Sequence, residues 1–314
     1  MKGLALYRAF DSEEVVRISG EVVEYGQGCK DGFVVAGFEG ERWFIRNEGL
    51  CDDRVFINRN DASAVCLYRE AFGKFSKVLR EGRFEKLVLS RREFLNIKVN
   101  PEQAFMNACS IYPDQTVILF STPQTGTWLV VTPELLVEMK GTEGRTMALA
   151  GTKKGERAWT EKERREQAVV AEYIEEKLKG VAERVIRYET EDAQAGELTH
   201  LRTRFEFQSN VGWSEVAHSL HPTPAVCGLP AEEAKEFILR YEGYDRRFYS
   251  GYCGVVRDAG CRLMVTLRCA EICEEGCWLY AGGGLLAESD EESEFVETEN
   301  KMQTIIKCIA VNHR

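Results

Sequence analysis

Three charged residues near the end of the sequence have the spacing of one helical face. Glu294, Glu297 and Lys301 fall within an arc of about 60° on a helical wheel. They flank an apolar stripe that runs from Phe295 to Ile309. Carboxylates and an ammonium beside a buried face suggest a polar pocket, in which oxygen ligands hold a hard metal ion next to an anion. An amphipathic helix with a solvated acidic face also explains this spacing, and such helices are common.

A second pair of carboxylates occurs in the segment KERREQ. Glu163 and Glu166 are three residues apart and therefore lie on one face of a helix. That face could present one or two oxygens to Mg²⁺, an ion that keeps several waters and takes few protein ligands. The alternative is a solvated helix start, in which arginine and glutamate side chains pair along the helix.

Lys86 and Glu134 have the character of a base and an acid. Lys86 begins the apolar run KLVL, and an ammonium in apolar surroundings loses hydration, which favours the neutral amine that a general base needs. Glu134 follows Thr132-Pro133 at the end of an expected strand. The structural alternatives are an edge-strand lysine in water and a glutamate at a helix N-terminus.

One cation and one glycine run suggest an anion site. Arg268 lies in the apolar segment VTLRCA, where a lone guanidinium needs a carboxylate partner from the protein or from a ligand. The run AGGG at 281–284 is expected to form a turn whose backbone amides are free to approach an anion. Three glycines alone are weak evidence and lack the dinucleotide-binding spacing.

The composition limits what the protein can be. With 314 residues, 44% of them hydrophobic and 29% charged, the chain has the make-up of a globular protein with a large core. Its net charge of −10, without a basic tract, argues against a nucleic-acid partner. The sequence shows neither a secretory h-region nor an apolar stretch of membrane-spanning length, so a cytoplasmic protein with no membrane partner is expected.

The 11 cysteines are expected to be reduced and mostly buried, because their number is odd and no signal peptide accompanies them. Cys269, Cys273 and Cys277 form a C-x3-C-x3-C series that lacks the usual C-x2-C spacing of zinc sites. His218 and His221 have no obvious third ligand and are expected to be structural. No thiolate or histidine metal site is therefore predicted.

Local signals predict many strands and few helices, without strict alternation. Helices are expected over 62–82, 101–109, 161–185 and 231–241 and from 291, with Asp61 and Thr160 as caps. Strands are expected within 1–60 and over 86–92, 116–121, 127–133, 145–152, 198–208, 252–257, 262–270 and 277–281. This order favours an α+β fold with large antiparallel sheets.

Eight segments of the sequence, taken in order, resemble chorismate-utilising enzymes. They are VLSR after Lys86, TPELL (132–136), LAGT (149–152), HLRTRF (200–205), LHPTPAVCGLP (220–230), YDRRFYSGYCG (244–254), VTLRCAEI (265–272) and YAGGG…EFVETENKM (280–302). The chain is most similar to the isochorismate synthases of menaquinone or siderophore biosynthesis. The resemblance implies one α+β domain over 1–314 with a buried site, made of an abbreviated β-rich part (1–60) and a catalytic core (61–314).

The resemblance also implies an activity and a set of roles. Isochorismate synthases add water at C2 of chorismate and expel the C4 hydroxyl, with Mg²⁺ holding the substrate carboxylate. At the matching positions Lys86 would be the general base and Glu134 the general acid. Glu166 and Glu297 would bind Mg²⁺, with Glu163 and Glu294 supporting the ion through water. The substrate would contact Gly151, Thr152, His200, Arg268, Gly282 and Lys301.

Other activities of this family are weighed by single residues. Ala150 stands where aminodeoxychorismate synthases carry a nucleophilic lysine, and the presence of Lys86 disfavours the ammonia-using anthranilate synthases. A salicylate synthase, which goes on to release pyruvate, shares Lys86 and Glu134 and stays open. A non-catalytic binding relative would not need that acid–base pair. Arg202 and Arg204 depart from the family pattern and are expected to add charge near the site, and the chain is expected to be a monomer.

Overall fold

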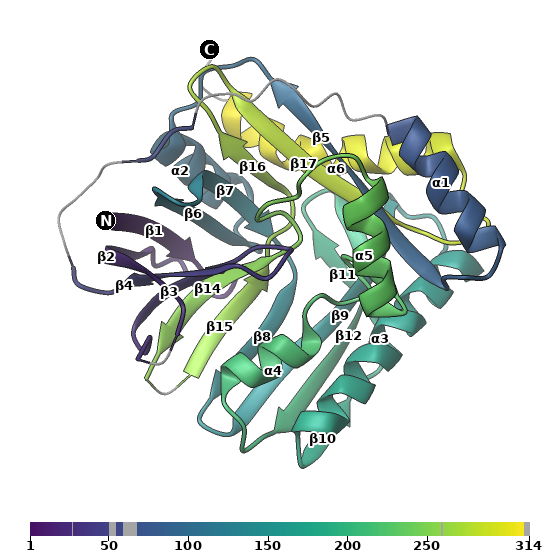
Figure 1. Ribbon diagram of the computed structural model, residues 1–314, viewed down its shortest axis with the longest axis horizontal. Helices are drawn as coiled ribbons and strands as arrows, with labels where there is room; N and C mark the ends of the chain where they lie inside the picture. The colour runs from purple at the N-terminus through teal and green to yellow at the C-terminus, as the bar shows by residue number, and fades with distance from the viewer. Residues whose placement is uncertain (27, 50–54, 59–67, 259, 311–314) are drawn as a thin grey trace.

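Two large antiparallel sheets with helices on their outer faces form the described part of the protein (Figure 1). The computed structural model describes residues 1–26, 28–49, 55–58, 68–258 and 260–310. Every ladder between the named strands of these residues is antiparallel. The predicted α+β class with large antiparallel sheets is confirmed.

The first sheet contains the strands that carry Lys86 and the glycine run. In spatial order they are β2 (Val16–Glu24), β1 (Lys2–Arg8), β6 (Thr116–Thr122), β7 (Gly126–Thr132), β16 (Cys269–Ile272), β17 (Cys277–Leu285), β5 (Lys86–Leu95) and β13 (Gly228–Leu229). The predicted hairpin of 116–121 with 127–133 is the β6–β7 pair.

The second sheet continues from the far end of β2, which pairs with β1 through residues 16–21 and with β4 through residues 22–24. In spatial order it contains β4 (Arg42–Arg46), β3 (Gly32–Ala36), β14 (Tyr252–Arg257), β15 (Gly260–Val265), β8 (Leu135–Lys140), β9 (Glu143–Lys154) and β12 (Leu198–Gln208). The outer edge of β12 pairs with β10 (Arg184–Arg187) and β11 (Glu191–Ala195). One shared strand thus joins the two sheets.

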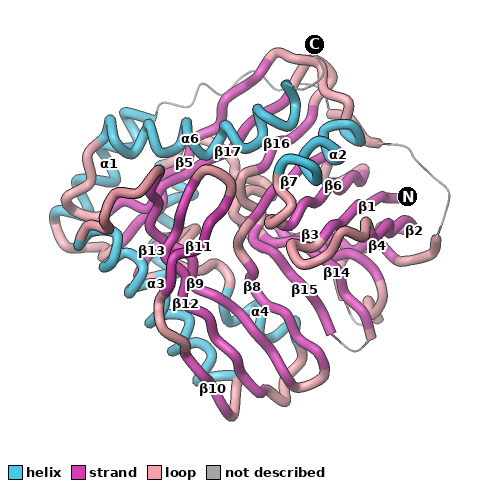
Figure 2. The backbone as a smooth tube through the Cα atoms, turned by 180° about the vertical axis from the view of Figure 1, so that it is seen from behind, coloured by secondary structure: helices cyan, strands magenta, loops and turns pink. Residues whose placement is uncertain are grey.

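Helices cover the outer faces of both sheets. They are α1 (Tyr68–Arg80), α2 (Pro101–Ile111), α3 (Glu161–Val181), α4 (Trp213–Leu220), α5 (Ala231–Tyr241) and α6 (Glu291–Ala310). The view from behind shows α6 and α2 on the first sheet, and α3 and α4 beyond the strands of the second (Figure 2). None of the helices in the described ranges is both long and apolar enough to span a lipid bilayer.

The faces that the two sheets turn toward each other form an apolar core. Phe120 and Trp128 of the first sheet pack in this core with Phe33 and Val35 of the second. Every residue of β6 and β7 is buried, because helices α2 and α6 cover their other face. Their uninterrupted apolar runs are typical of strands that are covered on both sides.

The helices predicted over 161–185 and 62–82 differ from the structure at their ends. The helix predicted over 161–185 begins as expected, with Thr160 and Glu163 forming a capping box, but it ends at Val181. Residues 184–187 instead form β10, because they pair with the end of β12, and that partner is distant in sequence. The helix predicted over 62–82 ends at Arg80. Its predicted start and the predicted cap Asp61 lie outside the described residues.

One strand prediction and one turn prediction near the site were wrong. The strand predicted over 262–270 is two strands, β15 and β16, and Arg268 lies between them with a left-handed backbone (φ 46°). The predicted glycine turn at 281–284 is instead the second half of β17, paired with β5. A run of glycines indicates backbone freedom, but here the missing side chains make room for a close approach of other groups.

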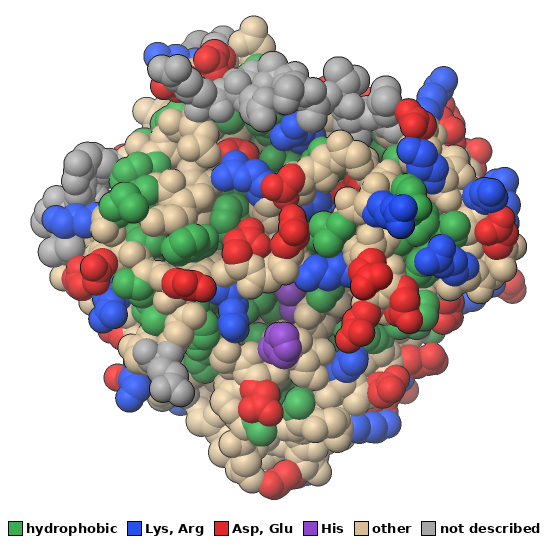
Figure 3. Space-filling view, viewed as in Figure 1, with side chains coloured by type: hydrophobic (Ala, Val, Ile, Leu, Met, Phe, Trp, Pro, Cys, Tyr) green, Lys and Arg blue, Asp and Glu red, His purple; other side chains and the backbone are tan. Residues whose placement is uncertain are grey.

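Arg202 and Arg204 do not add charge to the site, contrary to prediction. Arg202 lies opposite Glu191 in the ladder between β11 and β12, and neither arginine lines the cavity described below. Both arginines are therefore turned outward, where each pairs with Glu191. Acidic and basic side chains are interspersed on the face shown in Figure 3.

A buried ion pair fastens β5 to the segments around it. Glu242 and Arg246 have side chains that are each 1% exposed, and their closest atoms, Arg246 Nε and Glu242 Oε2, lie 2.6 Å apart. Glu242 also accepts hydrogen bonds from the backbone N–H and the hydroxyl of Ser90. Arg246 donates to the carbonyls of Val88 and Val226. The pair therefore holds two residues that line the cavity described below.

We expect Glu242→Gln to lower the free energy of unfolding by about 3–5 kcal/mol, because it leaves the Arg246 guanidinium buried without its counter-charge. Urea denaturation measures the change. The matched control is Glu70→Gln, which breaks an exposed pair with Lys74 and should cost about 0.5 kcal/mol or less. Equal effects of the two substitutions would contradict this account of the buried pair.

Candidate active site

A cavity opens where the two sheets meet α3 and α6, with about 640 Å³ of empty space including its mouth. Nine of the twelve residues assigned by resemblance line it: Glu134, Gly151, Thr152, Glu166, His200, Arg268, Gly282, Glu297 and Lys301. Lys86 is fully buried beside this cavity, and Glu163 and Glu294 line an adjoining hollow at its outer side. The structure thus gathers residues that are up to 215 positions apart in the sequence (86 to 301).

Lys86 is the first residue of β5 and is wholly buried. Its Nζ lies 2.9 Å from Oε1 of Glu166, although the angle does not meet hydrogen-bond geometry with any described residue. The space for this contact comes from Gly284 on the neighbouring β17. A Cβ at Gly284 would lie 2.2 Å from Glu166 Oε1 and 2.6 Å from Lys86 Cε. Any larger residue at position 284 would therefore force the lysine and the glutamate apart.

The glycine strand turns backbone groups toward the cavity. Gly282 is opposite Ser90 in the β17–β5 ladder, yet the Ser90 N–H donates to Glu242 and the Gly282 carbonyl accepts from Lys301. These two residues are therefore a non-hydrogen-bonded pair, in which the N–H and C=O of each residue point away from the other strand. Because β16 ends at the level of Tyr280, the Gly282 amide faces the cavity, where it can donate to an anion.

Glu134 lies in the connection between β7 and β8, and 3% of it is exposed. Among the described residues its carboxyl group has neither a hydrogen-bond nor an ion-pair partner. Burial raises the pKa of Glu134 to about 8, although the positive charges of Lys86, Lys301 and Arg268 lower it in part. At neutral pH this residue is therefore a protonated acid surrounded by three cations, which is the state that a proton donor requires.

Arg268 is a buried cation with no carboxylate within ion-pair distance among the described residues. The break between β15 and β16 directs its guanidinium into the cavity wall, where Nη1 donates to the carbonyl of Ala195 at 3.2 Å and to Oε1 of Gln115 at 3.4 Å. Burial lowers the pKa of Arg268 to about 10, so the side chain stays charged at neutral pH. A buried charge of this kind is stabilised when an anionic ligand supplies the missing counter-charge.

His200 is held as one neutral tautomer by its two neighbours. The Gly151 carbonyl, which can only accept, lies 2.9 Å from Nδ1, and the Arg268 guanidinium, which can only donate, contacts Nε2. The proton must therefore be on Nδ1. Burial, followed by the charge of Arg268, lowers the pKa of His200 well below its usual value. His200 thus orients Arg268 and does not act as a proton donor at its Nε2.

Lys301 and Glu297 are one turn apart on α6. Lys301 Nζ donates to Oε1 of Glu297 at 2.7 Å and to the carbonyl of Gly282 at 2.8 Å. This places the ammonium beside the cavity-facing amide of the same glycine. The Lys301 ammonium and the Gly282 amide therefore provide a second binding point for a negatively charged ligand, in addition to Arg268.

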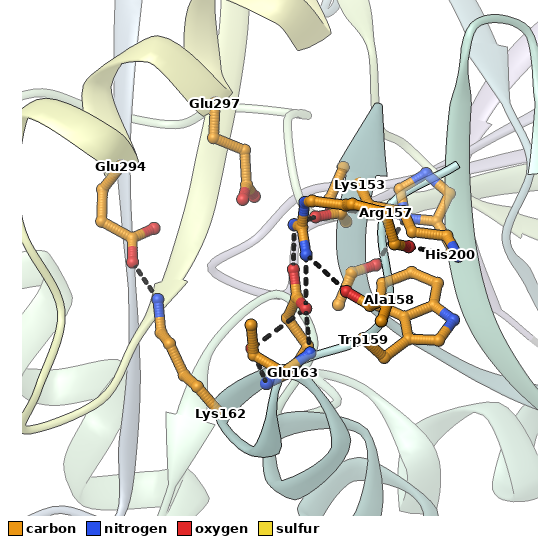
Figure 4. A network of polar contacts seen from close by, with 12 residues as sticks. Lys153, Arg157, Ala158, Trp159, Lys162, Glu163, His200, Glu294 and Glu297 are labelled. Carbon is orange, nitrogen blue, oxygen red and sulfur yellow. Dashed lines mark hydrogen bonds and ion pairs between the residues drawn. The ribbon is translucent and has the colours of Figure 1, made fainter. Parts of the chain in front are cut away.

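The two outer glutamates are already bound by basic side chains (Figure 4). Glu163 accepts from Arg157 through both carboxylate oxygens and closes the α3 capping box with Thr160. Glu294, which is 3% exposed, pairs with Lys162. Burial and then the adjacent Glu297 raise the pKa of Glu294, against the influence of Lys162. Neither outer carboxylate is free in this structure.

The inner carboxylates fit what Mg²⁺ asks of a protein. Glu166 from α3 and Glu297 from α6 line the same cavity, and the strand beneath them is bare: a Cβ at Gly283 would lie 3.5 Å from Glu297 Oε1. Mg²⁺ takes one or two carboxylates and completes its shell with water and substrate oxygens. In the part of the chain that the structure describes, no three acidic, histidine or cysteine residues form a metal-ligand group. The arrangement therefore fits an ion held by two carboxylates and not a closed protein cage.

The sequence did not single out several residues of the site, among them Tyr249, Val226 and Lys162. Tyr249 and Val226 line the cavity, and they come from two of the family motifs, YDRRFYSGYCG and LHPTPAVCGLP, to which no site role was assigned. Lys162 stands between two glutamates at a helix start, where a lysine is normally solvated. Its pairing depends on α6, which lies 132 residues further along the chain. His218 and His221 line a separate hollow near α4.

Comparison with known proteins supplies the family. The profile described as "Chorismate binding enzyme" matches residues 47–310, which include every residue that lines the cavity. This chain belongs to that family. Among curated relatives, the isochorismate synthase DhbC of Bacillus subtilis is 36% identical over 209 residues, covering 60% of this chain and 51% of the relative. The isochorismate synthase MenF of Escherichia coli is 30% identical over 241 residues, covering 72% and 56%. The chain thus spans about half the length of these relatives.

Three solved structures share the fold of this chain. DhbC from Bacillus anthracis has a TM-score of 0.85 at 24% identity, covering 99% of this chain and 96% of the other. MenF, the menaquinone-specific isochorismate synthase of Escherichia coli, has a TM-score of 0.83 at 18% identity, covering 98% and 88%. Anthranilate synthase component I of Streptococcus pneumoniae still reaches 0.73 at 14% identity, covering 96% and 91%. Because the fold occurs in structures described as isochorismate synthases and in one described as an anthranilate synthase component, the fold alone does not identify the reaction of this chain.

Proposed function

We propose that this chain is an isochorismate synthase, which adds water at C2 of chorismate and removes the C4 hydroxyl. The observation that carries the proposal is that one cavity holds both a neutral acid, Glu134, and a buried cation, Arg268, that has no carboxylate partner among the described residues. The names of the relatives with 30–36% identity support the same reaction. Ala150 lines the cavity and offers no amine, which supports water as the nucleophile.

Chorismate carries two carboxylates, and the cavity offers two groups of donors for them. One is the guanidinium of Arg268, held by His200, and the other is the Lys301 ammonium with the Gly282 amide. The family's Mg²⁺, held by Glu166 and Glu297, would supply a further positive charge for a substrate carboxylate. These contacts would hold the substrate ring in one orientation. The attacking water and the proton donor are then positioned at the reacting carbons, which lowers the entropic cost of the reaction.

Lys86 and Glu134 then divide the proton transfers. In the reacting complex Lys86 has given up its ammonium proton, and its neutral amine takes a proton from water as the water oxygen bonds to C2 and the ring double bonds shift. The bond between C4 and its hydroxyl oxygen breaks, and the leaving hydroxyl takes the proton from Glu134, so that water departs. Each group ends with the opposite protonation state, which the solvent restores. Before the reaction the positive charge of Lys86 lowers the pKa of Glu134, so the protonation state of one group affects that of the other.

We expect kcat/KM for chorismate to fall about tenfold per pH unit above about pH 8, because the acid form of Glu134 is lost there. Since burial raises this pKa, the proton is present below the pKa and is lost as the pH rises through it. A pH profile from 6 to 10 at saturating Mg²⁺ measures the effect. A rate that still rises between pH 8 and 9.5 would exclude Glu134 as the acid.

The lyase reaction of salicylate synthases starts from the same isomerisation and adds pyruvate loss. It uses the same acid and base, so the residues described here do not oppose it. Separating the products formed from chorismate distinguishes the two reactions, because only the lyase releases pyruvate. We propose isochorismate as the final product.

A further inference from the structure

Four basic side chains neutralise the four glutamates of the site, one each. Lys86 pairs with Glu166 and Lys301 with Glu297 on the cavity side. The outer pairs are Arg157 with Glu163 and Lys162 with Glu294 (Figure 4). These eight residues therefore hold four positive and four negative charges before any ligand arrives, and Arg268 adds a fifth positive charge to the cavity. A divalent cation that enters must change these pairs.

Lys162 differs from the other three cations in its position. It is in the first turn of α3, one turn before Glu166, and its side chain reaches across to Glu294 on α6. Its ammonium is also near enough to Glu166 and Glu297 for both to act on it electrostatically. The ammonium of Lys162 thus forms an ion pair with the buried Glu294. It also interacts electrostatically with both proposed Mg²⁺ ligands, Glu166 and Glu297.

We propose that Lys162 is a built-in competitor for the metal ion, whose ammonium holds Glu294 in the metal-free protein and weakens divalent-cation binding between Glu166 and Glu297. The inference rests on the proposed metal site. A fixed ammonium beside the ligands repels a divalent ion. It also keeps Glu294 from contributing its charge to that ion. Removing the ammonium should therefore tighten metal binding.

The chain offers a matched control in Lys154. This residue lines the same outer hollow as Lys162, but its ammonium pairs with Glu197, 3.4 Å away, and is mostly exposed. Lys154→Met and Lys162→Met change the net charge equally. Only the second removes a cation from a glutamate of the site, so the difference between them reports on the pair and not on the overall charge.

The test is the dissociation constant of Mn²⁺, a Mg²⁺ substitute, measured without substrate from the electron paramagnetic resonance signal of the free ion. We expect Lys162→Met to bind Mn²⁺ about tenfold more tightly than the wild type, Lys154→Met to stay within twofold, and Lys162→Arg to remain close to the wild type. In a Glu294→Gln background, Lys162→Met should have a much smaller effect. A gain for Lys162→Met no larger than that for Lys154→Met, or weaker binding, would overturn the inference. Failure of the wild type to bind Mn²⁺ would instead remove the metal site on which it rests.

Discussion

Replacing Lys86 with methionine should reduce kcat for the proposed chorismate isomerisation by about 10³-fold or more, because it removes the proposed base that activates water. Methionine keeps much of the length of the side chain and suits the apolar surroundings of β5. The substitution therefore changes the chemistry more than the packing. Steady-state kinetics with purified protein measures the loss.

Two controls separate the chemical effect of Lys86→Met from a structural one. Lys74→Met removes an exposed ammonium on α1 that pairs with Glu70, and it should retain wild-type kcat. The far-ultraviolet circular dichroism spectrum of Lys86→Met should match that of the wild type. If Lys86→Met keeps more than a tenth of the wild-type kcat, Lys86 is not the base.

Replacing Glu134 with glutamine should lower kcat by about 10²–10⁴-fold, the usual contribution of a general acid. The amide has the same shape and can donate a hydrogen bond, but it cannot release a proton to the leaving hydroxyl. The pH dependence above about pH 8 should disappear from the remaining activity, because that dependence comes from Glu134 itself. Full pH profiles of both proteins test this.

The stability of the same variant provides an independent control. The pKa of Glu134 is raised in the folded protein to about 8. The free energy of unfolding therefore decreases as the pH rises from the ordinary pKa of the unfolded glutamate to the pKa in the folded protein. Glutamine has no such loss. Glu134→Gln should therefore be at least as stable as the wild type at pH 8.5 in thermal unfolding. A variant that is both active and less stable would contradict the description of Glu134 as a buried neutral acid.

The sequence singled out residues that mostly line one cavity, but it predicted the backbone around them less well. Glu297 and Lys301 share a helix face because they are one turn apart, and the same local rule found the Thr160 cap of α3. Short-range spacing decides features of this kind. The assignment of Lys86 and Glu134 needed the ordered motifs, because a lysine before an apolar run is ordinary by itself.

Features that depend on distant partners were not accessible from the sequence. The glycine run reads as a turn because glycine is typical of turns, but β5 pairs with it and Lys86 and Glu166 use the space that Gly284 leaves open. The pairing of Lys162 with Glu294 requires α3 and α6 to lie side by side. Neither arrangement leaves a periodic signal, because both result from tertiary packing.

The most direct test of the proposed function is incubation of the protein with chorismate and Mg²⁺, followed by chromatographic separation of the products and an assay for pyruvate. Our account predicts an equilibrium mixture of chorismate and isochorismate without pyruvate, and no such conversion by Lys86→Met. Salicylate with an equal amount of pyruvate would assign the lyase reaction instead. Chorismate recovered unchanged from the wild-type protein would contradict the account.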